Sequence, residues 1–197
     1  MTALRTSIAA LACTLACSAA LLAAEEWKTI TLGGDPGFTI EVPTAATLEP
    51  PGKDPDEFMF LQASAGENGL LWCLARRFDY PKGGTQGIYA KVLATPRREV
   101  FCERDGAKDA QILTSDSFDH NGLQAATCAA SYTDPKDKKR PGHVQIQMLI
   151  AAKNGMYQLT CTVEDETVED AEMSWEYFWH DYIRRMQKCF HLPGKAG

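Results

Sequence analysis

The sequence predicts a single α+β domain, a mostly antiparallel sheet of hairpins layered with helices. Segments in which apolar and polar residues alternate recur along the chain, and a period of two is typical of strands. Gly- and Asn-rich turns separate many of these segments in pairs, which predicts hairpins. Helical spacing is confined to two segments. The expected order is therefore two hairpins, a helix, two further hairpins and a C-terminal helix.

Residues 1–24 are expected to form a signal peptide. Arg5 precedes an apolar, uncharged stretch over 8–24, which ends on small residues before the acidic Glu25. This stretch is shorter than the ~20 residues that a membrane-spanning helix needs. Cleavage could follow Ala20, Ala23 or Ala24. An uncleaved anchor, or a lipid on Cys13 or Cys17, is the alternative.

The single domain is then expected to occupy residues 25–197, with no transmembrane span after cleavage. Its first half is expected to contain four strands and a helix. Strand 70–78 begins almost wholly apolar, which predicts an interior strand covered on both faces. Pro96 predicts a kink or a break in the helix. The expected strands cover 27–32, 38–42, 57–63 and 70–78, the expected loop 44–56, and the helix 86–104.

The second half is expected to contain two more hairpins. Asn121-Gly122 and Asn154-Gly155 form their turns, because both residue types tolerate the positive φ that a tight hairpin turn requires. A charged loop bounded by Pro, residues 133–142, connects the two hairpins. The expected strands cover 110–118, 123–132, 143–153 and 156–163.

The C-terminal helix is expected to begin at Thr167, with Asp170 completing a capping box. The acidic stretch over 164–172 precedes and opens the helix, where carboxylates stabilise the positive end of the dipole. An apolar stripe is then expected to face the core, formed by Trp175, Phe178, Trp179, Tyr182, Ile183 and Met186.

The charge of the chain disfavours nucleic acid as a partner. The whole chain has a net charge of −6, and without Arg5 the 19 basic residues face 26 acidic ones, a net charge of −7. Binding to phosphates needs clustered Lys and Arg. The expected partner is instead another protein of the cell envelope.

Beyond the signal peptide, five cysteines remain: Cys73, Cys102, Cys128, Cys161 and Cys189. In an oxidising compartment they can form at most two disulfides and leave one thiol. We expect bridges from helix to sheet, with Cys102 or Cys189 each reaching a strand cysteine. Cysteines on strands that are not neighbours would be too far apart. The odd thiol is interpreted as structural, with a reactive catalytic thiol as the alternative.

Three stretches of local sequence carry a resemblance to a known fold: Trp27 with Gly37-Phe38-Thr39-Ile40-Glu41-Val42-Pro43, the Asn121-Gly122 turn into an Ala-rich strand, and the hairpin Asn154-Gly155-Met156-Tyr157-Gln158-Leu159. With the order of elements, they resemble the PsbP-like superfamily of α/β/α sandwiches, which includes photosystem II extrinsic protein P, the yeast Ran-binding import factor and DcrB-like bacterial periplasmic proteins. The resemblance covers most of residues 27–190. It implies a binding or assembly role without catalysis, and it assigns no catalytic residue.

Two groups of residues could carry acid–base chemistry. One is His180-Asp181, and the other is formed by Ser115, Ser117, Asp119 and His120. His180 is expected on the polar face of the C-terminal helix, and the second group at a strand edge beside a turn. Neither has the spacing of a known nucleophile motif. No metal-binding or phosphate-binding motif is present in the sequence, and no cofactor is expected.

The sequence therefore predicts an exported, periplasmic or secreted, non-enzymatic binding or assembly protein of the bacterial cell envelope. Function in such domains resides mainly in loops. The expected contact residues are Lys136, Lys138, Lys139, Arg140, Glu164, Asp165, Glu166 and Glu169. A hydrolase with an unrecognised Ser/His or thiol site, and a carrier of a small ligand, are the alternatives. The oligomeric state is left open.

Overall fold

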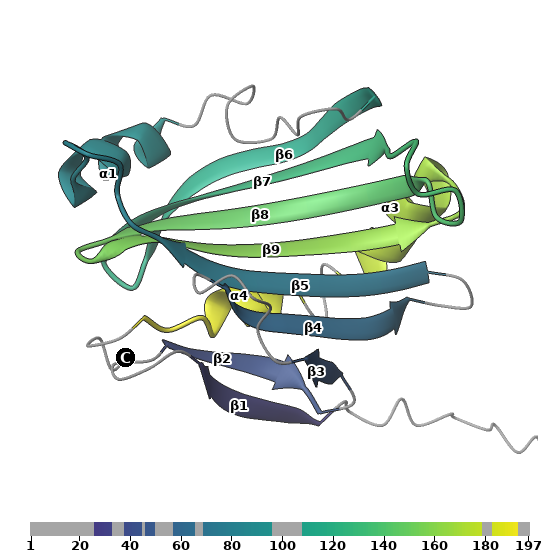
Figure 1. The fold of residues 1–197 in the computed structure, drawn as a ribbon, viewed down its shortest axis with the longest axis horizontal. Coiled ribbons are helices and arrows are strands. Elements are labelled where there is room, and N and C mark those ends of the chain that lie inside the picture. The colour runs from purple at the N-terminus through teal and green to yellow at the C-terminus, as the bar shows by residue number, and fades with distance from the viewer. Residues whose placement is uncertain are drawn as a thin grey trace, which may run out of the picture.

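The architecture was derived from a computed structural model of the chain, which is shown in Figure 1. The structure describes residues 26–32, 38–44, 46–49, 57–65, 69–95, 108–178 and 183–192. The expected signal peptide, the turn at 33–37, Cys102 and His180-Asp181 lie outside these residues. The described strands are β1 (Trp27–Leu32), β2 (Phe38–Pro43), β3 (Thr47–Glu49), β4 (Glu57–Ala65), β5 (Gly69–Phe78), β6 (Lys108–His120), β7 (Leu123–Thr133), β8 (Gly142–Ala152) and β9 (Gly155–Asp165). The described helices are α1 (Gln86–Ala94), α3 (Val168–Phe178) and α4 (Arg184–Lys188).

A seven-stranded antiparallel sheet forms the centre of the domain, in the order β3-β4-β5-β9-β8-β7-β6, and β1 and β2 form a separate hairpin. The α+β class is confirmed. The last strand of the sequence, β9, lies between β5 and β8 and so joins the two halves of the chain. Both faces of the sheet carry helices: α1 contacts β6, β7 and β8, whereas α3 covers β7, β8 and β9 from behind in Figure 1.

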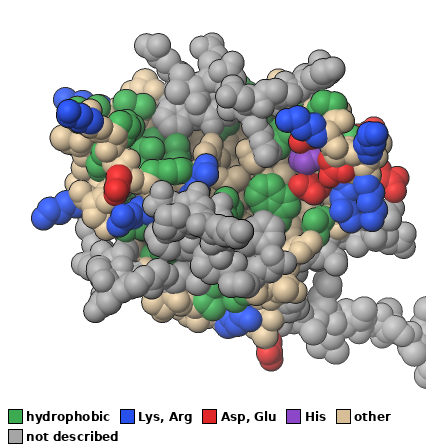
Figure 2. Space-filling view, in the orientation of Figure 1, with side chains coloured by type: hydrophobic (Ala, Val, Ile, Leu, Met, Phe, Trp, Pro, Cys, Tyr) green, Lys and Arg blue, Asp and Glu red, His purple; other side chains and the backbone are tan. Residues whose placement is uncertain are grey.

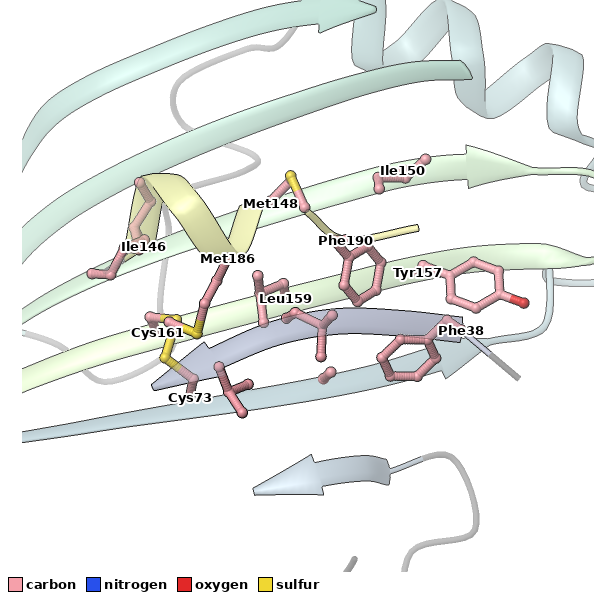
Figure 3. Close-up of a cluster of buried hydrophobic side chains, with 14 of the residues drawn as sticks. Phe38, Cys73, Ile146, Met148, Ile150, Tyr157, Leu159, Cys161, Met186 and Phe190 are labelled. Atoms are coloured by element: carbon pink, nitrogen blue, oxygen red, sulfur yellow. A yellow bond between two sulfur atoms is a disulfide. The ribbon is translucent and has the colours of Figure 1, made fainter. Parts of the chain in front are cut away.

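The main core lies on the face of the sheet that α3, α4 and the β1–β2 hairpin cover. Strand periodicity explains it, because alternate residues of β5, β8 and β9 point to this face. Figure 3 shows Phe38 of the hairpin and Phe190 after α4 meeting over Leu159 and Tyr157, with ring centroids of the two Phe 4.9 Å apart. A smaller apolar cluster around Leu93 holds α1 on the opposite face.

The C-terminal segment fixes the β1–β2 hairpin to the domain. Thr39 and His191 exchange two backbone hydrogen bonds, of 2.9 and 2.8 Å. Arg185 of α4 donates to a Glu41 carboxylate oxygen at 2.8 Å, and its guanidinium lies 4.3 Å from the centre of the Trp27 ring. The short strands of the hairpin therefore gain support from tertiary contacts that their own pairing does not supply.

Several expected boundaries are corrected by the structure. The 44–56 loop contains the short strand β3, which pairs with β4 and has too few residues to show a period. Helix α1 ends at Ala94, before Pro96, which agrees with the break expected there, and the rest of the expected helix, 96–104, lies outside the described residues. Strand β5 is interior, but its burial alternates, so one face is covered more completely than the other.

The expected helix-to-sheet bridging is wrong for the disulfide in Figure 3, which joins Cys73 of β5 to Cys161 of β9. These cysteines are directly opposite in the ladder, with Cα atoms 4.1 Å apart. Sequence order did not indicate that β5 and β9 are neighbours. Cys128 is also disulfide-bonded, whereas Cys189 is a free thiol.

Replacing both Cys73 and Cys161 by Ala is expected to lower the free energy of unfolding by about 3 kcal/mol. The bridge closes a loop of 88 residues and so restricts the unfolded chain. Urea denaturation of the oxidised proteins would measure the difference, with Cys189→Ala as the control expected to have a much smaller effect. A non-reducing peptide map in which Cys73 and Cys161 are not linked would contradict the assignment.

Candidate partner-binding surface

Two segments that the sequence separately predicts as contact surfaces lie together at one end of the sheet. Strands β8 and β9 place Gly142 opposite Asp165, so the β7–β8 loop adjoins the β9–α3 junction. We call this surface, formed by residues 134–141 and 164–170, the charged end. Figure 2 shows blue and red side chains gathered on the right, where these segments lie in Figure 1.

The β7–β8 loop is folded by its own aspartates. The Asp134 side chain accepts the backbone N–H of Lys136, and the Asp137 side chain accepts those of Lys139 and Arg140, each at 2.9 Å. The Asp134 N–H donates to the carbonyl of Pro141, also at 2.9 Å, and closes the loop. Asp is favoured in such turns because its short side chain reaches the backbone two or three residues ahead. The loop thus has a defined shape that presents its lysines.

The basic side chains of this loop point outward, whereas the two aspartates between them are used internally. Lys136, Lys138 and Lys139 are exposed, and Arg140 is half-buried. The backbone N–H groups of Arg140 and Lys139 hold the pKa of Asp137 below its ordinary value, the Arg140 bond contributing most. Asp137 therefore remains ionised, and the loop remains folded, throughout the neutral range.

The acidic segment divides into internal and exposed carboxylates. Glu164 accepts from the Trp72 indole N–H at 2.6 Å, and Asp165 accepts from the Glu166 N–H and the Ser174 hydroxyl. Glu166 and Glu169 are exposed. The acidic residues that a partner could reach without breaking these bonds are thus the latter two.

Helix α3 begins as the sequence predicts. The Thr167 hydroxyl accepts the Asp170 N–H at 3.1 Å and donates to the Asp170 carboxylate at 2.6 Å. Glu169 and Asp170 lie in the first turn, where they stabilise the positive end of the helix dipole. The acidic segment therefore has a structural role in addition to any contact it makes.

His143 is the buried group beneath the charged end. Its Nε2 lies 2.9 Å from the Arg140 carbonyl, so this nitrogen carries the proton in the bond. Its Nδ1 lies 3.9 Å from a carboxylate oxygen of Glu164. The ring also contacts Tyr132 and thereby ties the end of the loop to the sheet.

The Ser/His group at the β6–β7 hairpin has structural hydrogen bonds. The Ser117 hydroxyl donates to the Ala94 carbonyl at 3.2 Å, and Asp119 accepts the Gly122 N–H at 2.8 Å. His120 is buried with its Nε2 2.6 Å from the Phe190 carbonyl. Ser117 and His120 are three residues apart on one strand, so their side chains leave opposite faces. The strand does not bring them together as a nucleophile and a base.

The free thiol, Cys189, is placed against Glu41 at the end of α4. Partial burial raises the pKa of Cys189, and the Glu41 carboxylate raises it further. A raised pKa leaves less of the nucleophilic thiolate at neutral pH. This environment favours the structural interpretation of the thiol over the catalytic one.

Two further features bear on ligands and membranes. Among the described residues, no group of three or more His, Cys, Asp or Glu side chains is placed to hold a metal ion. No helix in the same part of the chain is both long and apolar enough to cross a membrane.

Comparison with solved structures shows that this is the PsbP-like fold. The Ran-binding protein Mog1p of Saccharomyces cerevisiae is similar with a TM-score of 0.54 and 13% identity, covering 85% of this chain and 95% of that chain. LpqN of Mycobacterium tuberculosis, involved in cell envelope biogenesis, is similar with a TM-score of 0.52 and 11% identity. The match covers 85% of this chain and 91% of LpqN. Cyanobacterial PsbP from Synechocystis sp. PCC 6803 is similar with a TM-score of 0.50 and 12% identity. The match covers 86% of this chain and 93% of that chain.

No family model and no curated protein sequence matches the chain. At identities of 11–13%, the structural likeness establishes the fold alone. The predicted resemblance to the PsbP-like superfamily is confirmed at this level.

Gly142→Ala is expected to destabilise the charged end, with a loss of about 2 kcal/mol or more in the free energy of unfolding. A Cβ on Gly142 would lie 2.0 Å from the carbonyl carbon and oxygen of Thr167, both of which are backbone atoms. Gly87→Ala on α1 is the control, because its Cβ would meet nothing nearer than 4.0 Å. Thermal or urea denaturation would measure both variants, and equal stability of the two would contradict the contact.

The Asp137 carboxyl is expected to titrate below its ordinary pKa of 3.8. Because the folded pKa is lowered, the stabilisation of the loop is complete above the ordinary value and is lost as pH falls through the lowered one. A carboxyl ¹³C titration would measure the midpoint, with Asp137→Asn to assign the resonance. Amide exchange at Lys139 and Arg140 should accelerate over the same range. A midpoint at or above 3.8 would be inconsistent with these hydrogen bonds.

Proposed function

We propose that this chain is an exported, non-enzymatic binding or assembly protein of the bacterial cell envelope, and that its charged end contacts another envelope protein. The observation that carries the proposal is the folded β7–β8 loop. Asp134 and Asp137 shape this loop through backbone hydrogen bonds, so that exposed lysines are presented beside Glu166 and Glu169.

A folded loop suits this role because ordering a flexible segment on binding costs free energy. Charges of both signs on one surface favour a partner with the complementary arrangement and disfavour others. Exposed charges also accelerate encounter, and this effect weakens as salt shortens the screening length from ~10 Å at 0.1 M to ~3 Å at 1 M. Capture of the partner is therefore expected to depend on salt.

Two further observations support export and binding. The Cys73–Cys161 disulfide suits an oxidising compartment, which agrees with the expected signal peptide. The PsbP-like fold also occurs in a Ran-binding protein and in a protein involved in cell envelope biogenesis. This likeness is one of fold, and the assignment of a partner surface rests on the charged end itself.

The hydrolase alternative receives less support from the described residues. Ser117 and His120 point to opposite faces of β6, and the thiol of Cys189 has a raised pKa.

Neutralising Lys136, Lys138 and Lys139 to Gln is expected to reduce capture of an envelope partner by about tenfold or more at low salt. The bait is the full chain, tagged at its C-terminus, expressed in its native cells and crosslinked in the isolated envelope. Mass spectrometry would identify the captured protein and the N-terminal residue of the bait, which tests cleavage of the expected signal peptide.

The matched control changes Lys82, Lys91 and Lys153 to Gln, which removes the same number of exposed positive charges elsewhere on the domain. A second variant, Glu166→Gln with Glu169→Gln, tests the acidic part of the surface. Equal loss of capture in the lysine variant and its control would exclude the charged end as the contact. An intact residue 1 on the bait would exclude cleavage.

A further inference from the structure

A pocket of about 570 Å³ lies between the β6–β7 hairpin and α4. It is at the opposite end of β7 from the charged end, and it contributes nothing to the partner surface proposed above. The volume lies within the range of ~300–1,000 Å³ typical of small-ligand sites. The lining residues that matter here are Asp116 and His120 of β6 and Arg184, Gln187 and Lys188 of α4.

The α4 wall of the pocket carries two cations. Arg184 and Lys188 are four residues apart, so both lie on one face of the helix, and both side chains are exposed. Within the described part of the chain, neither forms an ion pair. Arg185, between them in sequence, points elsewhere and is bound to Glu41 and Trp27. Arg185 therefore has a structural role, whereas Arg184 and Lys188 line the pocket.

The side chain of Gln187 is a polar group held in the same wall. The residue is 8% exposed and lines the pocket. No hydrogen bond to its amide is found within the described residues. The amide reaches the pocket, where it offers two N–H donors and one carbonyl acceptor to whatever enters. Its burial on the pocket wall is the observation, independent of the two cations, that indicates a ligand.

The β6 wall carries the opposite charge. Asp116 is exposed and has no hydrogen bond or ion pair among the described residues. Asp119, three residues further along β6, leaves the opposite face of the strand and accepts the Gly122 N–H. His120 donates from Nε2 to the Phe190 carbonyl, so its Nδ1 can accept a hydrogen bond when the ring is neutral. This wall therefore offers acceptors, whereas the α4 wall offers donors.

We propose that this pocket binds a small zwitterion of the amino-acid type. The carboxylate of the ligand lies against Arg184 and Lys188 and accepts from the Gln187 amide, and its ammonium group lies toward Asp116. The lining holds two cations on one wall and the Asp116 carboxylate on the other, so a ligand with a single charge leaves one wall unmatched. The proposal is independent of the charged end.

The test is a ¹⁵N NMR titration of the mature protein with L-leucine and two analogues that each lack one of its charges. These are 4-methylpentanoate, without the ammonium group, and 3-methylbutylamine, without the carboxylate. L-Leucine is expected to give saturable shifts at the amides of residues 116–121 and 184–188, and each analogue is expected to bind about tenfold more weakly. Inorganic phosphate is the fourth probe.

Two variants assign the walls. The double variant Arg184→Gln with Lys188→Gln should weaken the binding of L-leucine by about tenfold without affecting the binding of 3-methylbutylamine. The variant Asp116→Asn should weaken the binding of L-leucine without affecting the binding of 4-methylpentanoate. Lys153→Gln, an exposed change at the neighbouring turn, should leave binding unchanged. Absence of shifts at these amides up to about 10 mM L-leucine would overturn the proposal. So would equal binding by either analogue, or binding of phosphate alone.

Discussion

The pairing of β5 with β9 is the constraint on which the rest of this structure depends. It joins Leu70–Phe78 to Met156–Glu164 in one register, and the disulfide between Cys73 and Cys161 lies inside it. This ladder unites the β3–β5 half of the sheet with the β6–β9 half. Because side chains alternate between faces, a slip of one residue would move Leu159 and Val163 out of the core. The same slip would separate Trp72 from Glu164, the carboxylate that lies beside His143 at the charged end.

The register also separates an apolar face from a polar one. Residues of β9 such as Leu159 meet the hairpin and C-terminal helices in the core, whereas Gln158, Thr160 and Thr162 point to the other face and are also buried. These polar groups pair across strands, since Arg76 donates to Gln158 and Gln145 donates to Thr162 at 3.0 Å. Hydrogen bonding offsets the desolvation that buried polar side chains would otherwise suffer. These alternate polar residues of β9 continue to Glu164, so the buried polar side chains extend to the charged end.

The two ends of the sheet carry different kinds of surface. At the charged end, a loop folded by Asp134 and Asp137 presents exposed lysines to solvent. At the other end, α4 and the β6–β7 hairpin enclose a pocket with separated charges. A sheet can support both, because its strands are rigid and the connections at either end vary independently. On the apolar face, α4 and the β1–β2 hairpin stabilise the strands away from the charged end, whereas the first turn of α3 forms part of it.

The sequence by itself determined the local structure of this protein. The period of two predicted the long strands, Asn121-Gly122 predicted a turn in which both residues have positive φ, and Thr167 with Asp170 predicted the start of α3. Each depends on backbone preferences within a few residues. Tertiary structure alone decided that β9 lies beside β5, and therefore that Cys73 pairs with Cys161. The meeting of the 133–142 loop with the acidic segment follows instead from the β8–β9 hairpin, whose turn the sequence predicts. Tertiary structure also placed Gln187 in the wall of a pocket. The physical reason is that a strand shows which of its faces is apolar, whereas its neighbour is chosen by the packing of the whole sheet.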